Sequence, residues 1–236
     1  MKKFICILLV TLLSVFTFSA CSKNTTTDSN NPNGTTANSQ TTSEDTQSSD
    51  DTSGTVASSS TTTNEVSFTA TNHIEINVKN YGTIAVALDA KAAPITVANF
   101  LQLVESGFYN GLTFHRIISG FMIQGGDPNG NGTGGSSKTI KGEFTANGVN
   151  NSLSNTRGAI AMARLPNDND SATSQFFIVQ QDSTTLDGQY AVFGYVTSGM
   201  DIVDKICENT PVQDTNGTVL AKDQPVITSI KVLAEK

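Results

Sequence analysis

Apolar and polar residues alternate in two short runs of the chain, which is the pattern of strands with one buried face. The first run covers residues 74–78 (IEINV) and the second covers residues 84–88 (IAVAL). Because successive side chains of a strand point to opposite faces, each run places its large apolar residues on one side. Tyr81 and Gly82 lie between the runs, so the pattern predicts a β-hairpin.

Two other segments repeat their apolar residues at helical spacing. The first extends from Pro94 to Gly107, since proline suits the first turn of a helix and glycine its C-terminal exit. The second covers about Met200 to Glu208. Each predicted helix has one apolar side: Val97, Phe100, Leu101 and Val104 in the first, and Val203, Ile206 and Cys207 in the second.

Short apolar runs separated by glycine-rich turns make up much of the remaining sequence. Many short strands with two isolated helices are typical of a β-barrel capped by helices. The runs predict these further strands: Thr113–Ile118, Phe121–Gln124, Ala159–Met162, Phe176–Val179, Ala191–Val196 and Val226–Leu233.

Residues 1–20 have the organisation of a secretion signal. Two lysines precede the apolar stretch Phe4–Phe18, and two small residues come before Cys21. An apolar residue, two small residues and a cysteine resemble a bacterial lipoprotein signal, in which the cysteine takes the lipid. Phe18 departs from the aliphatic residue that is usual there. The alternatives are an ordinary leader cleaved near Ala20 and an uncleaved anchor, although the apolar stretch is short for a spanning helix.

A polar stretch, residues 22–64, separates this leader from the patterned part of the chain. It consists almost entirely of Ser, Thr, Asn, Asp and Gly. Such a stretch cannot bury enough apolar surface to offset its ordering entropy, which favours a flexible tether over a structured stalk. We therefore expect three parts: a lipoprotein signal peptide at residues 1–20, a lipidated Cys21 with a disordered tether at residues 21–65, and a folded domain at residues 66–236.

The charge of the chain argues against two classes of partner. There are 14 basic and 21 acidic residues, and loss of the two lysines in the leader leaves 12 against 21, a net charge of −9. A negative surface repels phosphate backbones, so we expect no nucleic acid partner. It also repels anionic lipid, so membrane contact depends on the lipid at Cys21. The expected location is the extracytoplasmic face of the cell membrane, through the lipid anchor.

Cysteine and histidine are too few for a disulfide framework or a metal centre. If Cys6 leaves with the leader and Cys21 carries the lipid, Cys207 has no partner within the chain. His73 and His115 are the only histidines. We therefore expect a fold that rests on its hydrophobic core and that holds neither metal nor cofactor.

A charged residue interrupts the apolar face of one predicted strand. If residues 112–118 are extended, Leu112, Phe114, Arg116 and Ile118 face the same way. An arginine at this place either reaches out to water or an acid, or is a permanently charged donor beside an apolar pocket. The next segment offers apolar Phe121 and Met122, then Gln124 with both a donor and an acceptor. By composition alone, core plus turn explains that segment as well as a pocket does.

Residues 114–127 read FHRIISGFMIQGGD, which resembles the central signature of the cyclophilins. Five further segments match that family in order, and the resemblance covers about residues 73 to 234. It implies an eight-stranded antiparallel β-barrel capped by two α-helices, which agrees with the strand and helix pattern. The five segments are NGTGG at 131–135, GAIAMA at 158–163, SQFFI at 174–178, LDG at 186–188 and VFG at 192–194.

The resemblance also implies a set of site residues. Arg116 matches the catalytic arginine of the family, and it acts with Phe121 and Gln124. Two positions depart from the family pattern: Arg164 replaces an asparagine that works largely through its backbone, and Tyr190 replaces a histidine at the pocket edge. The substrate-binding residues implied are His115, Met122, Gly132, Ala163, Arg164, Gln175, Phe177, Leu186 and Tyr190.

The family activity is peptidyl-prolyl cis-trans isomerisation, the rotation of X–Pro bonds, which requires no nucleophile, metal or cofactor. We expect a monomer that acts on proline-containing segments of exported proteins and assists their folding. Two other functions are compatible with the same surface: a module that binds proline segments without turning them over, and an adhesin or holdase in which the domain is only a scaffold. A dependence of function on Arg116 separates catalysis from the scaffold.

Overall fold

The computed structural model describes residues 72–233 of the chain. The signal peptide, the lipidated Cys21 and the tether that we predict lie outside the described residues and remain predictions. Neither helix of the described part is long and apolar enough to cross a membrane.

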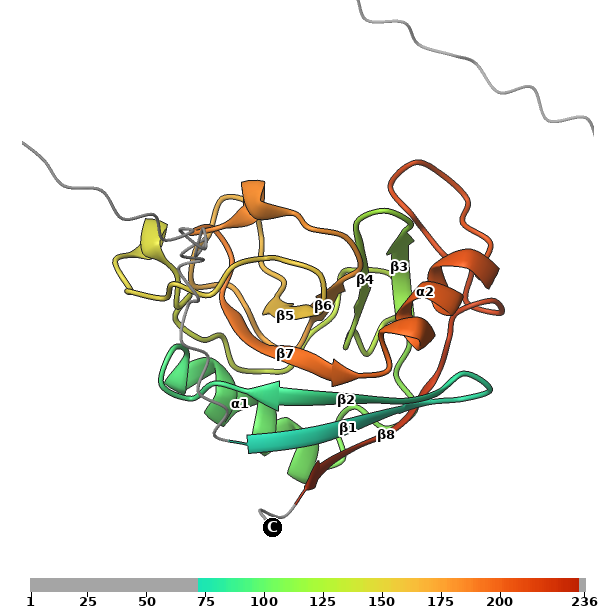
Figure 1. Cartoon of the computed structure of the whole chain (residues 1–236), viewed down its shortest axis with the longest axis horizontal. Coiled ribbons are helices and arrows are strands. Elements are labelled where there is room, and N and C mark those ends of the chain that lie inside the picture. Colours follow the sequence, from blue (N-terminus) through green and yellow to red (C-terminus); the bar gives the residue numbers. More distant parts are fainter. Residues whose placement is uncertain (1–71, 234–236) are drawn as a thin grey trace, which may run out of the picture. The chain divides into compact units, whose positions relative to one another are not determined.

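Eight strands, two α-helices and two short 3-10 helices form the described part of the chain (Figure 1). The predicted strands and helices are all present, with ends that shift by a few residues; the two 3-10 helices were not predicted. The strands are β1 (Asn72–Val78), β2 (Gly82–Leu88), β3 (Phe114–Ile118), β4 (Met122–Gly125), β5 (Ala159–Met162), β6 (Phe176–Val179), β7 (Val192–Ser198) and β8 (Ile227–Leu233); the helices are α1 (Pro94–Glu105) and α2 (Met200–Asn209), with η1 (Thr145–Asn147) and η2 (Thr184–Leu186).

The strands form one antiparallel sheet in the order β3-β4-β6-β5-β7-β2-β1-β8. The sheet curls so far that its two edge regions meet (Figure 1). The backbone N–H of Phe114 donates to the carbonyl of Pro225 at 3.0 Å, and that of Ile227 donates to Leu112 at 2.8 Å. These bonds satisfy backbone groups that an open edge would leave exposed. The predicted mainly β class, with eight antiparallel strands and two helices, is confirmed.

An aromatic cluster fills the interior of the curled sheet. Phe100 of α1 lies against Phe176 of β6 and Phe193 of β7, with ring centroids 5.5 and 5.1 Å apart. Phe176 also meets Tyr109 and Phe114 edge-on, at 5.6 and 6.1 Å. Offset and edge-on ring pairs add to the gain from burying so much apolar area. The predicted apolar side of α1 therefore closes the interior of the sheet.

One expectation about β3 was wrong. Phe114 pairs with Gly125 of β4, and Arg116 pairs with Gln124, which is adjacent to Gly125 in the chain. Two steps along β3 therefore match one step along β4, so β3 has one extra residue, His115, at this point. Such a bulge reverses the facing of the residues on either side. Phe114 accordingly belongs to the interior cluster, whereas Ile118 packs with the apolar cluster of the outer face. Arg116 does not share a face with Phe114.

We expect Phe176→Ala to lower the free energy of unfolding by roughly 3–5 kcal/mol, because the lost ring leaves a cavity among rings that cannot collapse onto it. Leu165→Ala is the control: this side chain is 64% exposed, so its removal should change stability by no more than about 0.5 kcal/mol. Denaturant titration of both variants measures the difference, and equal losses would show that the interior cluster is not the main core.

Candidate active site

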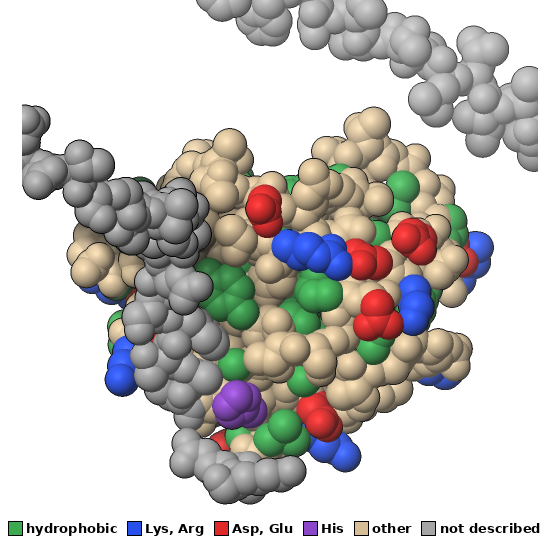
Figure 2. Space-filling view, in the orientation of Figure 1, with side chains coloured by type: hydrophobic (Ala, Val, Ile, Leu, Met, Phe, Trp, Pro, Cys, Tyr) green, Lys and Arg blue, Asp and Glu red, His purple; other side chains and the backbone are tan. Residues whose placement is uncertain are grey.

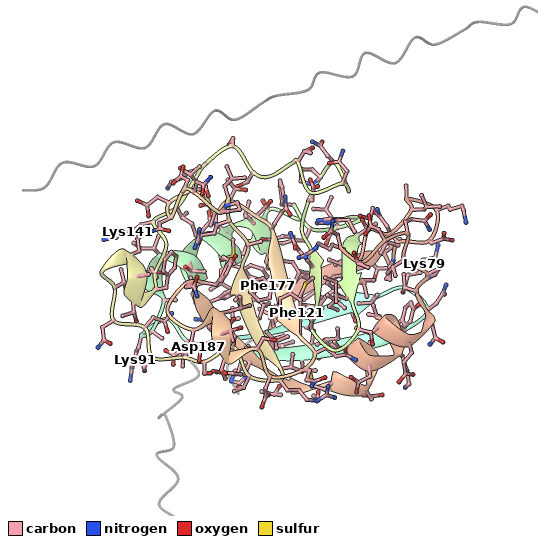
Figure 3. All side chains as sticks on the ribbon, turned by 90° about the horizontal axis from the view of Figure 1, so that it is seen from above. Lys79, Lys91, Phe121, Lys141, Phe177 and Asp187 are labelled. Atoms are coloured by element: carbon pink, nitrogen blue, oxygen red, sulfur yellow. The ribbon has the colours of Figure 1, made fainter. Side chains whose placement is uncertain are left out.

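The outer face of the curled sheet carries a second apolar cluster, separate from the interior. Met122 of β4 and Phe177 of β6 are buried in it, and Phe121 packs against them. Figure 3 labels Phe121 and Phe177 close together near the middle of the molecule. A hollow of about 300 Å³ adjoins this cluster, and we call it the first cavity. Its lining is Arg116, Phe121, Met122, Gln124, Ala163, Arg164, Pro166, Phe177, Leu186 and Tyr190.

Arg116 reaches the first cavity because the bulge turns it to the outer face. Its Nε donates to the carbonyl of Asn216 at 2.8 Å, and its Nη1 donates to Oε1 of Gln124 at 3.2 Å. Both acceptors are neutral, and no ion pair of the described residues involves Arg116. The guanidinium is thus held in place beside an apolar surface with its positive charge uncompensated.

The hydrogen-bond chain continues from Gln124 to the glycine-rich loop. The amide of Gln124 donates to Oε1 of Gln175 at 2.9 Å, and the amide of Gln175 donates to the carbonyls of Gly132 and Gly134 at 3.2 and 2.7 Å. Each glutamine donates in one direction and accepts in the other. Arg116, β4, β6 and the loop are therefore fixed relative to one another.

A buried carboxylate organises the same loop. Asp127 accepts from the backbone N–H of Asn129, Asn131 and Gly132 at 2.8, 3.0 and 2.5 Å. Burial alone would raise the pKa of Asp127, but these three donors favour the charged form and leave its pKa below the usual value. Gly132 has a φ of 88°, a left-handed conformation that suits glycine.

A second, more polar cavity of about 330 Å³ adjoins the first. The two cavities share Gln124, Ala163 and Arg164. Arg164 stacks on two rings: its guanidinium carbon lies 4.9 Å from the centroid of Tyr190 and 5.2 Å from that of Phe144. The remaining lining residues of the second cavity are Gly132, Thr133, Gly134, Gly135, Ser136, Leu165, Ser171, Thr173 and Gln175.

The family described as cyclophilin type peptidyl-prolyl cis-trans isomerase/CLD matches residues 73–232. The chain belongs to the cyclophilin-type peptidyl-prolyl cis-trans isomerases. Peptidyl-prolyl cis-trans isomerase A of Dickeya dadantii is 46% identical over 149 residues, which are 59% of this chain and 73% of the relative. Peptidyl-prolyl cis-trans isomerase B of Bacillus subtilis is 50% identical over 111 residues, 47% of this chain and 73% of the relative.

A solved structure supports the same assignment. A Cryptosporidium parvum cyclophilin type peptidyl-prolyl cis-trans isomerase, crystallised in the presence of the dipeptide Ala-Pro, superposes with a TM-score of 0.61 at 32% identity. The match covers 69% of this chain and 99% of that one. The cyclophilin resemblance and the enzyme class predicted from the sequence are confirmed; the lipoprotein form stays a prediction.

Most of the residues that the cyclophilin resemblance implied gather at the two cavities. Gly132 and Gln175 line only the second cavity, and His115 lines neither. Pro166 and the carbonyl of Asn216, which holds Arg116, were not anticipated. Neither has a signal of its own in the sequence, because each lies in a loop that the fold brings to the site.

Arg164 contributes its side chain to the site. This side chain borders both cavities and stacks on Tyr190, and the backbone role that the resemblance implies at this position stays a prediction. The segment from Arg164 to Ser174 folds back through the bond from the Leu165 backbone N–H to the Ser171 hydroxyl at 2.8 Å. This segment, which is rich in Asn and Asp, therefore forms part of the wall of the second cavity.

The sulfur of Cys207 offers no nucleophile to this enzyme. The residue is buried in α2 and forms no disulfide among the described residues. Burial, followed by the nearby charges of Asp204 and Glu208, raises the pKa of the thiol to about 12. The thiol is therefore protonated at neutral pH, and the residue belongs to the interior apolar cluster.

His115 is expected to make folding stability depend on pH. The side chain is 5% exposed, and neither ring nitrogen has a partner among the described residues. Burial, aided by Arg116 and opposed by Asp127, lowers its pKa. The unfolded state therefore binds more protons than the folded state, and stability is lost as pH falls below about 6.5.

We expect His115→Gln to flatten the change in unfolding free energy between pH 7.5 and pH 5.5. The wild-type slope owed to this one residue can reach at most about 1.4 kcal/mol per pH unit. Denaturant unfolding at several pH values in this window measures both slopes. Identical slopes would show that His115 takes up its proton equally well in the folded protein.

Proposed function

We propose that this chain catalyses the rotation of X–Pro bonds in exported proteins at the outer face of the cell membrane, to which lipidated Cys21 ties it. The observation that carries the catalytic part is the placement of Arg116 beside the apolar floor of the first cavity.

The reaction breaks no bond, so it needs only a site that favours the twisted amide. Amide resonance sets a barrier of ~18–20 kcal/mol to rotation. A twisted amide loses this conjugation, and its nitrogen gains a lone pair that can accept a hydrogen bond. Arg116 keeps N–H groups free of carboxylate partners and is charged at any working pH. A donor that binds the twisted state more strongly than the planar one lowers the barrier.

The rest of the first cavity is suited to hold the substrate during rotation. Met122, Phe121 and Phe177 offer apolar contact to a proline ring and exclude water from it. Gln124 is fixed by bonds to Arg116 and Gln175, which makes it a positioned group for the substrate backbone. Rotation of the X–Pro bond requires that the proline ring is held while the preceding carbonyl turns, and the apolar residues of the first cavity can hold the ring in this way.

The proposed location is supported by the sequence of the first 65 residues. A basic start, an apolar stretch and small residues before Cys21 are the parts of an exported, lipidated chain. Acidic residues exceed basic ones by 7 over the whole chain, and charges of both signs are mixed on the face shown in Figure 2. Adhesion to anionic lipid by charge alone is therefore weak, and the acyl chains supply the anchor.

Arg116→Ala is expected to lower kcat/KM for an X–Pro peptide by about one to two decades. This follows from the roughly 1.5–3 kcal/mol that a charge-assisted hydrogen bond contributes. Thermal melts should change little, because Arg116 is part of neither apolar cluster. Arg116→Lys should restore little activity, since an ammonium lacks the planar fork.

Phe121→Ala is the contrasting variant, because it removes part of the apolar wall and should weaken peptide binding as well as turnover. Near-normal isomerisation by a folded Arg116→Ala protein would contradict the catalytic proposal. It would favour the module that binds proline segments without turning them over.

Replacing Cys21 by Ala should move the protein from the membrane fraction to the soluble fraction of its host. The reason is that stable attachment requires the lipid chains, which no other residue of the chain would carry. Fractionation with immunoblotting gives the result. Retention in the membrane after this change would identify an uncleaved leader as the anchor.

A further inference from the structure

Arg164 stands at the boundary between the first and the second cavity and lines both. Its guanidinium is oriented by two rings, Phe144 and Tyr190, at 5.2 and 4.9 Å. Three of its N–H groups donate to backbone carbonyls: Nε to Gln189 at 3.0 Å, and Nη1 to Leu165 and Pro166 at 2.9 and 3.0 Å. A side chain held in this way loses little further freedom when it binds a ligand.

The charge of Arg164 has no counter-charge at the site. A guanidinium has five N–H donors, and the two on Nη2 have no partner among residues 72–233. No Asp or Glu lines either cavity. The two carboxylates of the adjoining loop accept hydrogen bonds from groups other than Arg164. Asp170 accepts from Gly142 and Asn147, and Asp168 accepts from the backbone N–H of Asp170.

The two cavities differ in what they accept. The floor of the first is apolar and suits the proline ring itself. The second is lined by the hydroxyls of Thr133, Ser136, Ser171 and Thr173, which suit a polar side chain. A residue beside the proline is therefore the part of the substrate that can meet Arg164.

We propose that Arg164 is a specificity-determining residue that favours substrates with a carboxylate side chain, Asp or Glu, directly beside the isomerised proline. The proposal rests on the isomerase function proposed above. A carboxylate in the second cavity would accept from the two N–H groups on Nη2 of Arg164. Arg164 is half-buried, and three of its N–H groups already donate to carbonyls. The binding free energy gained from the carboxylate is therefore that of a partly solvated ion pair.

The test is a set of peptides with acetylated and amidated ends, so that no terminal charge interferes. One series places Ala, Gln, Glu or Lys before the proline, and the other places the same residues after it. Exchange NMR measures kcat/KM without a coupling protease. We expect the ratio of Glu to Gln peptides to be roughly twofold to fivefold in at least one series, and to fall in 0.5 M salt because of screening.

Three variants identify the source of that ratio. Arg164→Gln should bring the Glu to Gln ratio to about one, and Arg164→Lys should keep part of the preference. Lys91→Gln removes the same charge from an exposed residue that lines neither cavity and lies at the edge of the molecule in Figure 3, so it should keep the wild-type ratio. The ratio is informative even if Arg164→Gln slows all peptides.

The outcomes separate this proposal from the one on which it rests. If no peptide is isomerised, the proposed function fails. If Ala peptides are isomerised but the wild-type Glu to Gln ratio is one in both series, only the specificity proposal fails. It also fails if Arg164→Gln slows Glu and Gln peptides equally, since Arg164 would then only hold the loop, or if Lys91→Gln lowers the ratio as much, since net charge would then be the cause.

Discussion

The extra residue in β3 is the constraint on which the site depends. With regular pairing, Arg116 would share the interior face with Phe114, where an unpaired charge is very costly. The bulge at His115 sends Phe114 into the aromatic interior and Arg116 to the outer face, two residues apart in the chain. One strand thus supplies both a core residue, Phe114, and the proposed catalytic group, Arg116, on opposite faces of the sheet.

The bulge also sets the surroundings of His115. The residue it inserts is buried beneath the glycine-rich loop, whose carboxylate Asp127 is held by three backbone donors. A Cβ on Gly132 would lie 3.8 Å from Nε2 of His115, an ordinary contact distance, so the loop passes beside the ring. From this loop the chain of amides through Gln175 and Gln124 returns to Arg116. The bulge in β3 and the conformation of the glycine-rich loop are therefore linked through His115 and this chain of hydrogen bonds.

Much of the fold is readable from the sequence because its signals are local. The alternation at residues 74–78 and 84–88 and the apolar stripe of α1 each depend on residues a few positions apart. The bulge is not readable in this way, since Phe114 to Ile118 keeps a plausible alternation, and only the pairing with β4 reveals the extra residue. The stacking of Arg164 on Phe144 and Tyr190 joins three separate loops, and no local pattern encodes it.

Both arginines of the site are held by neutral acceptors, and this has a chemical consequence. Arg116 donates to a carbonyl and an amide oxygen, and Arg164 donates to three carbonyls. A carboxylate partner would fix a guanidinium more strongly, but it would also neutralise the charge and compete with the substrate for its N–H groups. Neutral acceptors orient the fork without that competition. A catalyst that acts only by donating hydrogen bonds to a turning amide therefore benefits more from weakly satisfied arginines than from strong ion pairs.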